Sequence, residues 1–397
     1  MFESLRAVPA DPILNLSILY RQDTNPNKVD LGVGVYKDEA GHTAIMEAVS
    51  RAQELILVEE DTKAYVGMAG SKRYCDLLAQ TTLGAYHTVL TNNRFAVAQT
   101  PGGSGALRVL AEFINVAKPG ATVWAGNPTW ANHSPIMQSA GLEIKQYPYY
   151  DKDTKAVDFD GMLATLKAET KAGDVVLLHA CCHNPSGADL SLEQWQATAD
   201  LIKVKGLLPY VDIAYQGLGE GMDEDAAGLR LMANTVPEMV IASSCSKNFG
   251  LYRERTGTAI IISATEAQAH ITQSQMNGLI RANYSMPPSH GALVVETILA
   301  DPKLKQMWRD ELKTMRKRIK HLRGQLVDAI KAEGVEQDFS FIERQHGMFS
   351  FLGINAAQVD QLVNEHSVYL VGSSRINLAG LNQRNIAYVA KAIAAVL

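Results

Sequence analysis

One lysine stands where it could do covalent chemistry. In IASSCSKNFGLYRERTG an apolar run ends in Ser243 and Ser244, and Lys247 and Arg255 follow it. A lysine beside a desolvated strand end can lose its proton and become a carbonyl nucleophile. Ser244 and Arg255 offer hydroxyl and guanidinium donors suited to a phosphate dianion. For an isolated lysine the more common alternative is a side chain that extends to solvent beside an exposed arginine.

Two further polar groups follow apolar runs. LLPYVDIAYQG contains Asp212 and Tyr215, and HACCHNPSGADL contains Asn184 before Pro185. A buried carboxylate needs a cationic or hydrogen-bonding partner, and a protonated pyridine nitrogen would be one. A helix N-cap is an equally good interpretation of a lone aspartate. The bond between Asn184 and Pro185 restricts the backbone and can be cis, although a simple turn also explains it.

A glycine-rich turn supplies the last piece. TPGGSGALRVL places Gly102, Gly103, Ser104 and Gly105 just before a predicted helix. Glycines let the backbone approach a ligand, and the N–H groups of a helix start favour an anion. The segment has no P-loop lysine and does not fit G-x-G-x-x-G after a strand, so neither nucleotide motif is met. A tight turn with a serine cap is the competing interpretation.

Together these segments make four demands on one molecule. Lys247 needs an aldehyde, Ser104 and Arg255 need an anion, and Asp212 needs a ring cation. A phenolate oxygen would satisfy the pair formed by Asn184 and Tyr215. Pyridoxal phosphate carries all four groups, so we expect it as the cofactor.

The cysteines offer a rival interpretation. A zinc site could be built from His179, Cys181, Cys182 and His183. Adjacent cysteines on a strand fit the usual zinc-ligand spacing poorly, so we expect no metal. With Cys75 and Cys245 the chain has four cysteines, too few for a disulfide framework in a chain this long, which favours a reducing cytoplasm.

The elements that must position these groups alternate between strands and helices. Five apolar runs suit strands buried on both faces of a mostly parallel sheet: ATVWAG, DVVLLHACC, LLPYVDIAYQG, MVIASSCSK and GTAIIIS. GALRVLAEFINVA and a long segment from Leu304 have helical periodicity. The basic face of the long segment, with Arg316, Lys317, Arg318 and Lys320, is expected to be solvated. This pattern predicts an α/β fold with ligand groups beyond the carboxyl ends of the strands.

Length and charge limit the function further. The 397 residues exceed one ordinary core, so two lobes are expected. A net charge of -5 offers no overall basic field for nucleic acid. No signal peptide and no apolar run of membrane-spanning length is recognised, so we expect no membrane partner.

Several motifs together resemble the class I aspartate and aromatic aminotransferases of fold type I. They are NPTWANH, HNPSGADL, DIAYQGLGEGMDEDA, SSCSKNFGLYRERTG, RANYSMPPSHGA and GMFSFLG. The resemblance implies a large domain with a mostly parallel seven-stranded sheet at 44–314 and a smaller α+β domain at 15–43 and 315–397. It also implies a homodimer, an N-terminal arm at 1–14 that reaches the partner, and ping-pong transfer to 2-oxoglutarate through an internal aldimine.

The resemblance also implies roles for individual residues. It makes Lys247 the imine lysine and proton carrier, with Asp212 and Tyr215 as further catalytic groups. The expected cofactor-binding residues are Gly103, Ser104, Trp130, His133, Asn184, Asp212, Tyr215, Ser244, Lys247, Arg255 and, from the other subunit, Tyr65. The expected substrate-binding residues are Gly34, Trp130, Asn184, Arg281, Phe349 and Arg375. Arg375 would clamp the α-carboxylate, and Arg281 would reach a side-chain carboxylate across the dimer.

Substrate breadth depends on where the chain departs from the family pattern. Ala64, Ser104 and Met286 stand where strict aspartate enzymes usually carry polar Asn or Thr, whereas Val35, Lys37 and Thr43 keep the aspartate-type pattern. We therefore expect an enzyme that accepts aspartate and aromatic amino acids, with a strict aspartate aminotransferase as the alternative. Two less favoured function classes stay open at this point: a β-lyase or decarboxylase with the same cofactor, and a binding protein that has kept the fold.

Overall fold

The computed structural model describes residues 2–7 and 12–397, and these divide into two compact units. Unit 1 comprises residues up to Thr43, Arg318–Arg344 and Met348–Leu397, and unit 2 comprises Ala44–Lys317 and Gln345–Gly347. The arm expected at 1–14 lies partly outside the described residues, because positions 1 and 8–11 are not among them.

Unit 2 is built on a seven-stranded sheet with the order β2-β10-β9-β8-β7-β3-β4. Its strands are β2 (Phe95–Pro101), β3 (Thr122–Asn127), β4 (Glu143–Pro148), β7 (Val175–His179), β8 (Leu208–Ile213), β9 (Met239–Ser244) and β10 (Thr256–Ile262). All neighbouring pairs are parallel except the two that involve β10. A small hairpin of β5 (Tyr150–Asp151) and β6 (Ala156–Val157) follows β4.

The central strands are apolar because both of their faces are covered. Every residue of β9 and β10 is buried, and so is all of β8 except its first residue. The predicted strands are therefore present and the mostly parallel sheet is confirmed. Uninterrupted apolar runs do not encode strand direction, which is why the antiparallel course of β10 was not predictable.

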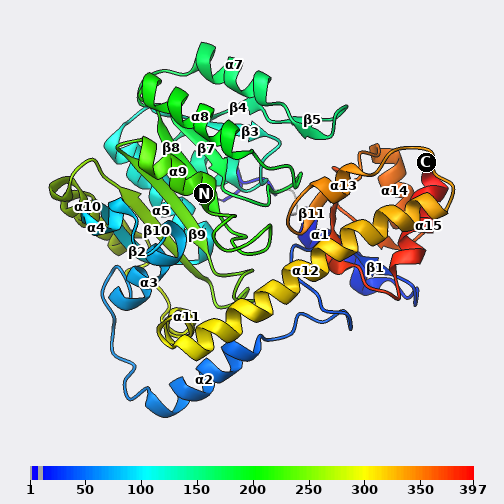
Figure 1. The fold of residues 1–397 in the computed structure, drawn as a ribbon, viewed down its shortest axis with the longest axis horizontal. Coiled ribbons are helices and arrows are strands. Elements are labelled where there is room, and N and C mark those ends of the chain that lie inside the picture. Colours follow the sequence, from blue (N-terminus) through cyan, green and yellow to red (C-terminus); the bar gives the residue numbers. More distant parts are fainter. Residues whose placement is uncertain (1, 8–11) are drawn as a thin grey trace. The chain divides into compact units, whose positions relative to one another are not determined.

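Helices cover the faces of this sheet (Figure 1). The helices of unit 2 are α2 (Glu47–Glu59), α3 (Lys72–Leu83), α4 (Thr88–Thr91), α5 (Gly102–Ala117), α6 (His133–Ser139), α7 (Phe159–Glu169), α8 (Leu192–Lys205), α9 (Ala227–Thr235), α10 (Glu266–Asn283), α11 (His290–Ala300) and the first half of α12 (Pro302–Ala332), whose residues from Arg318 on belong to unit 1. The core of unit 2 joins α5, α6 and α10 to the strands, as Leu110, Met137 and Ile280 show. The predicted helix in GALRVLAEFINVA is α5, whose Leu107, Leu110, Phe113 and Ile114 are buried.

Unit 1 has its own core. Its elements are α1 (Pro12–Gln22), β1 (Val29–Asp30), α13 (Phe341–Arg344), β11 (Phe349–Phe351), α14 (Ala356–Asn364), β12 (Val368–Tyr369), β13 (Arg375–Asn377), a 3-10 turn (Leu378–Gly380) and α15 (Ile386–Val396). β1 pairs with β12 in parallel and β11 pairs with β13 antiparallel. Leu31, Phe341, Leu362 and Ile393 belong to one buried cluster, so these short strands and helices pack around a common core.

The long helix α12 corrects one expectation. Lys317 and Lys320 are exposed as predicted, but Arg316 and Arg318 are partly buried. Arg316 Nη1 donates to the carbonyl of Gly217 at 3.3 Å, and Arg318 donates to main-chain carbonyls and to Glu39. The prediction that the whole basic face is solvated was therefore wrong, because guanidinium groups also donate hydrogen bonds to loop carbonyls. Among the described residues no helix has the length and apolar character to span a membrane.

Candidate active site

Asp212 lies near the carboxyl end of β8 and is 7% exposed. Its Oδ2 is 3.1 Å from Nε2 of His133, a fully buried residue at the start of α6. Burial alone would raise the pKa of this carboxyl, but the hydrogen bond and charge of His133, then His179 and Lys247, lower it below its usual value. The structure therefore keeps a carboxylate ionised in a buried place.

Thr129 and His179 extend this arrangement and were not predicted as site residues. Thr129 Oγ1 lies 2.8 Å from His133 Nδ1 and 3.0 Å from His179 Nε2. Thr129 follows β3 and His179 ends β7, and these two strands are parallel neighbours. Residues after adjacent parallel strands meet at one sheet edge, which is the signal that could have found them. Thr129 therefore orients the histidine that holds Asp212.

Lys247 follows β9 and lies close to Tyr215, which follows β8. The Lys247 Nζ is 5.0 Å from the centroid of the Tyr215 ring. β8 and β9 are paired in parallel, with Ile213 opposite Ser243, so the loops after both strands leave the same edge. The charge of Lys247 contributes to lowering the pKa of Asp212. The structure thus brings the three predicted catalytic side chains together.

The glycine-rich turn forms a cradle that side chains would block. Gly102 has a φ of +73°, and a Cβ there would lie 2.4 Å from Nη2 of Arg255. A Cβ on Gly103 would lie 2.9 Å from Cβ of Ser244. Gly102, Gly103 and Ser104 begin α5, so helix N–H groups, a hydroxyl and a guanidinium meet there. This combination suits a phosphate.

Trp130 and Asn184 lie in loops at the same edge of the sheet. The Trp130 ring is partly buried and meets His133 edge-on, with centroids 5.4 Å apart. Asn184 is 7% exposed, and its bond to Pro185 is cis, as the sequence allowed. His179 at the end of β7 is the register partner of Asp212, so the loop that carries Asn184 begins beside Asp212.

Unit 1 contributes a separate group of predicted residues. Arg375 is 5% exposed in β13, and its Nη2 donates to the carbonyl of Gly32 at 2.6 Å. Its guanidinium carbon lies 4.4 Å from the centroid of the buried Phe349 ring. A Cβ on Gly34 would lie 3.0 Å from the Phe349 ring. Gly34, Phe349 and Arg375 are therefore neighbours, with a planar cation on an aromatic face.

Among the described residues of unit 2, Arg281 and Tyr65 lie apart from the Lys247 group. Arg281 is exposed at the end of α10, where its Nη1 donates to the Ser285 hydroxyl. Tyr65 is 94% exposed and lies between α2 and α3. Within the described residues neither side chain forms an ion pair or a ring contact with the Lys247 group.

Comparison with known proteins decides the family. Residues 26–393 match the family described as aminotransferase class I and II. This chain is a class I and II aminotransferase. It is 47% identical to an aspartate aminotransferase of Escherichia coli, with all of both chains covered. It is 45% identical to an aromatic-amino-acid aminotransferase of Pseudomonas aeruginosa, covering 100% of this chain and 98% of the relative.

A solved structure supports the same family. The aminotransferase is 43% identical to an aromatic-amino-acid aminotransferase of Burkholderia pseudomallei that is covalently bound to pyridoxal phosphate. The TM-score is 0.98, and the match covers 100% of this chain and 99% of the other. The aminotransferase is therefore a fold type I enzyme that depends on pyridoxal phosphate.

The residues of unit 2 fit this cofactor. The cradle of Gly102 and Gly103 leaves room beside Arg255 and Ser244 that any side chain would fill. Asp212 is an ionised carboxylate that could hold a ring cation, and Lys247 is the amine beside it. Bound pyridoxal phosphate supplies an aldehyde that condenses with amines and a ring that withdraws electrons.

The rival zinc interpretation is not supported by these contacts. The His179 and His183 nitrogens bond to the hydroxyls of Thr129 and Ser186. The described residues do contain a close group of Cys181, Cys182 and Asp225. The Asp225 carboxylate already accepts main-chain N–H groups from Gly217, Gly219 and Glu220, at 2.8 to 2.9 Å. The Asp225 carboxylate therefore fixes the main chain of residues 217–220, a role that needs no metal ion.

Proposed function

We propose that the aminotransferase moves the amino group of both dicarboxylic and aromatic amino acids to 2-oxoglutarate by a ping-pong reaction. The observation that carries this proposal is the state of Arg281. Its guanidinium donates to a neutral hydroxyl, and it forms no ion pair with any of the described residues. A guanidinium without a carboxylate partner in its own chain is available to the second carboxylate of a dicarboxylic substrate, and an aromatic substrate does not require it.

The residues of the chain would share the work. Arg375 would hold the α-carboxylate of either substrate, because its planar fork matches a carboxylate. Phe349, on the face of Arg375, would give an aromatic ring an apolar wall. Lys247 would carry the proton from Cα, and Asp212 would remain ionised, held by His133, while the proton moves. Trp130, Asn184 and Tyr215 would orient the cofactor.

We also propose a homodimer in which Tyr65 and Arg281 serve the partner's site. A stretch of the chain rich in exposed apolar side chains supports this: Ile45, Leu55, Leu57, Val58, Tyr65 and Met68. Residues 44–314 would form the cofactor-binding domain, 15–43 and 315–397 the small domain, and 1–14 the arm. All four cysteines are free and buried, which supports a reducing cytoplasm.

Steady-state turnover of aspartate and phenylalanine tests the substrate proposal. We expect measurable kcat/KM for both in the wild type. In Arg281→Ala we expect about tenfold or more loss of kcat/KM for aspartate and little change for phenylalanine. Of these two donors only aspartate brings a second carboxylate, and in a ping-pong reaction kcat/KM for a donor does not depend on the acceptor. Arg309→Ala, which removes an exposed arginine from α12, is the control. No detectable turnover of phenylalanine would leave the strict aspartate enzyme as the answer.

A further inference from the structure

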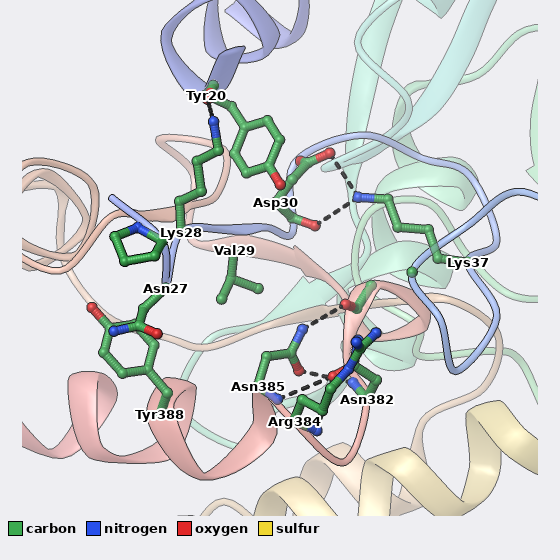
Figure 2. Close-up of a pocket in the computed structure, with 13 residues that line it drawn as sticks. Tyr20, Asn27, Lys28, Val29, Asp30, Lys37, Asn382, Arg384, Asn385 and Tyr388 are labelled. Carbon is green, nitrogen blue, oxygen red and sulfur yellow. Dashed lines mark hydrogen bonds and ion pairs between the residues drawn. The ribbon is translucent and has the colours of Figure 1, made fainter. Parts of the chain in front are cut away.

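Unit 1 contains a pocket of about 340 Å³ beside β1, lined by polar side chains (Figure 2). The basic side chains that line the pocket already have hydrogen-bond or ion-pair partners. Lys28 and Arg384 donate to main-chain carbonyls, and Lys37 pairs with Asp30 at 2.9 Å. The pocket is therefore poorly suited to an anion, and its informative feature is the Asp30 carboxylate in its wall.

Asp30 fixes the turn that follows β1. Its Oδ1 accepts the N–H of Gly32 at 3.0 Å and that of Val33 at 3.3 Å. Its Oδ2 accepts from Lys37 Nζ, which also donates to the Asp30 carbonyl at 3.3 Å (Figure 2). An ionised side chain that accepts two consecutive main-chain N–H groups sets the course of the backbone. Lys37 orients that carboxylate.

The same turn touches the predicted substrate clamp. The carbonyl of Gly32 accepts the 2.6 Å bond from Arg375 Nη2. Further along the same turn, Asn377 Nδ2 donates to the carbonyls of Val33 and Val35, each at 2.7 Å. Gly34 lies between those two carbonyls. The direction of the Gly32 carbonyl, and with it one arm of the Arg375 fork, is thus set by the Asp30 carboxylate two residues earlier.

We propose that Asp30 is a positioning residue for binding of the substrate α-carboxylate. It does not touch the substrate. It holds the turn 30–35 so that the Gly32 carbonyl fixes Arg375 and Gly34 stays against Phe349. This inference rests on the proposed role of Arg375 as the carboxylate clamp.

Four variants of the full enzyme with its cofactor test the inference. Asp30→Ala removes both N–H acceptor bonds, and Asp30→Asn keeps an oxygen that can accept them. Asp338→Ala is the matched control, because Asp338 accepts the N–H of Ser340 in an exposed turn of the same unit that carries no predicted site residue. Arg375→Ala tests the clamp itself. The readouts are KM and kcat for aspartate, and the dissociation constant of 3-phenylpropionate by calorimetry.

We expect Asp30→Ala to raise KM and the 3-phenylpropionate dissociation constant by about tenfold, with kcat within about twofold. Asp30→Asn should return both to within about threefold of wild type. Wild-type values in Asp30→Ala beside a raised KM in Arg375→Ala overturn this inference alone. Unchanged values in Arg375→Ala overturn the clamp and this inference together. A fall of kcat in Asp30→Ala as large as its rise in KM, without rescue by Asp30→Asn, would show that Asp30 has a merely structural role. That result also overturns this inference.

Discussion

At the scale of single residues, the site depends on the carboxylate of Asp212, which stays ionised although it is buried. Asp212 stays ionised because His133 donates to it, and His133 is in turn set by Thr129. His183 nearby behaves in the opposite way. Burial, then the neighbouring His179 and His133, lowers the pKa of His183 well below its usual value, and its ring is 1% exposed. His183 is therefore neutral in the folded enzyme.

The neutral His183 predicts acid sensitivity. Below pH 6.5 an unfolded histidine binds a proton that the folded His183 does not, so lowering the pH favours the unfolded state. Replacing His183 by Asn, which can still accept from Ser186, should flatten the fall in the free energy of unfolding by about 1.4 kcal/mol per pH unit between about pH 6 and 5. Urea unfolding at several pH values measures this. Parallel profiles for variant and wild type would contradict it.

Residues that follow an apolar run were predictable one at a time. Asp212 lies near the end of one such run and Lys247 follows another, so the residue type and its place at a strand end pointed to the same role. Thr129 could have been found only from the pairing of β3 with β7, because its partners His133 and His179 come from two segments that meet when these strands pair. Single-residue patterns carry no information about which strands are neighbours.

At the scale of elements, the periodicity of apolar residues predicted whether a segment forms a strand or a helix. It predicted less well the direction of a strand and the burial of single residues. The apolar runs of β7, β8 and β9 gave buried parallel strands, and α5 buried the expected face. β10 has the same apolar character but runs antiparallel, since its direction depends on the turn after Lys247. Ala117 has the helical spacing of the buried residues of α5 but is exposed as the last residue of the helix.

At the scale of the whole molecule, the exposed apolar stretch at 45–68 predicts association. α2 buries Ala52 and Ile56, while Leu57 and Val58 are each 85% exposed. Introducing Leu57→Asp with Val58→Asp should leave the fold intact and convert a dimer to a monomer, because charges at an apolar interface lose their hydration. Sedimentation velocity measures the mass. Val204→Asp, at an 84% exposed position of α8, should remain dimeric. A double variant that stays dimeric would contradict this interface.

The assignment of Lys247 is tested most directly by borohydride reduction of the enzyme with pyridoxal phosphate, followed by mass spectrometry of its peptides. Reduction makes the bond between a lysine and the cofactor permanent. We expect the phosphopyridoxyl group on the peptide that contains Lys247, and its absence from that peptide in Lys247→Ala. A label on another lysine, or no label on the wild-type enzyme, would contradict the assignment.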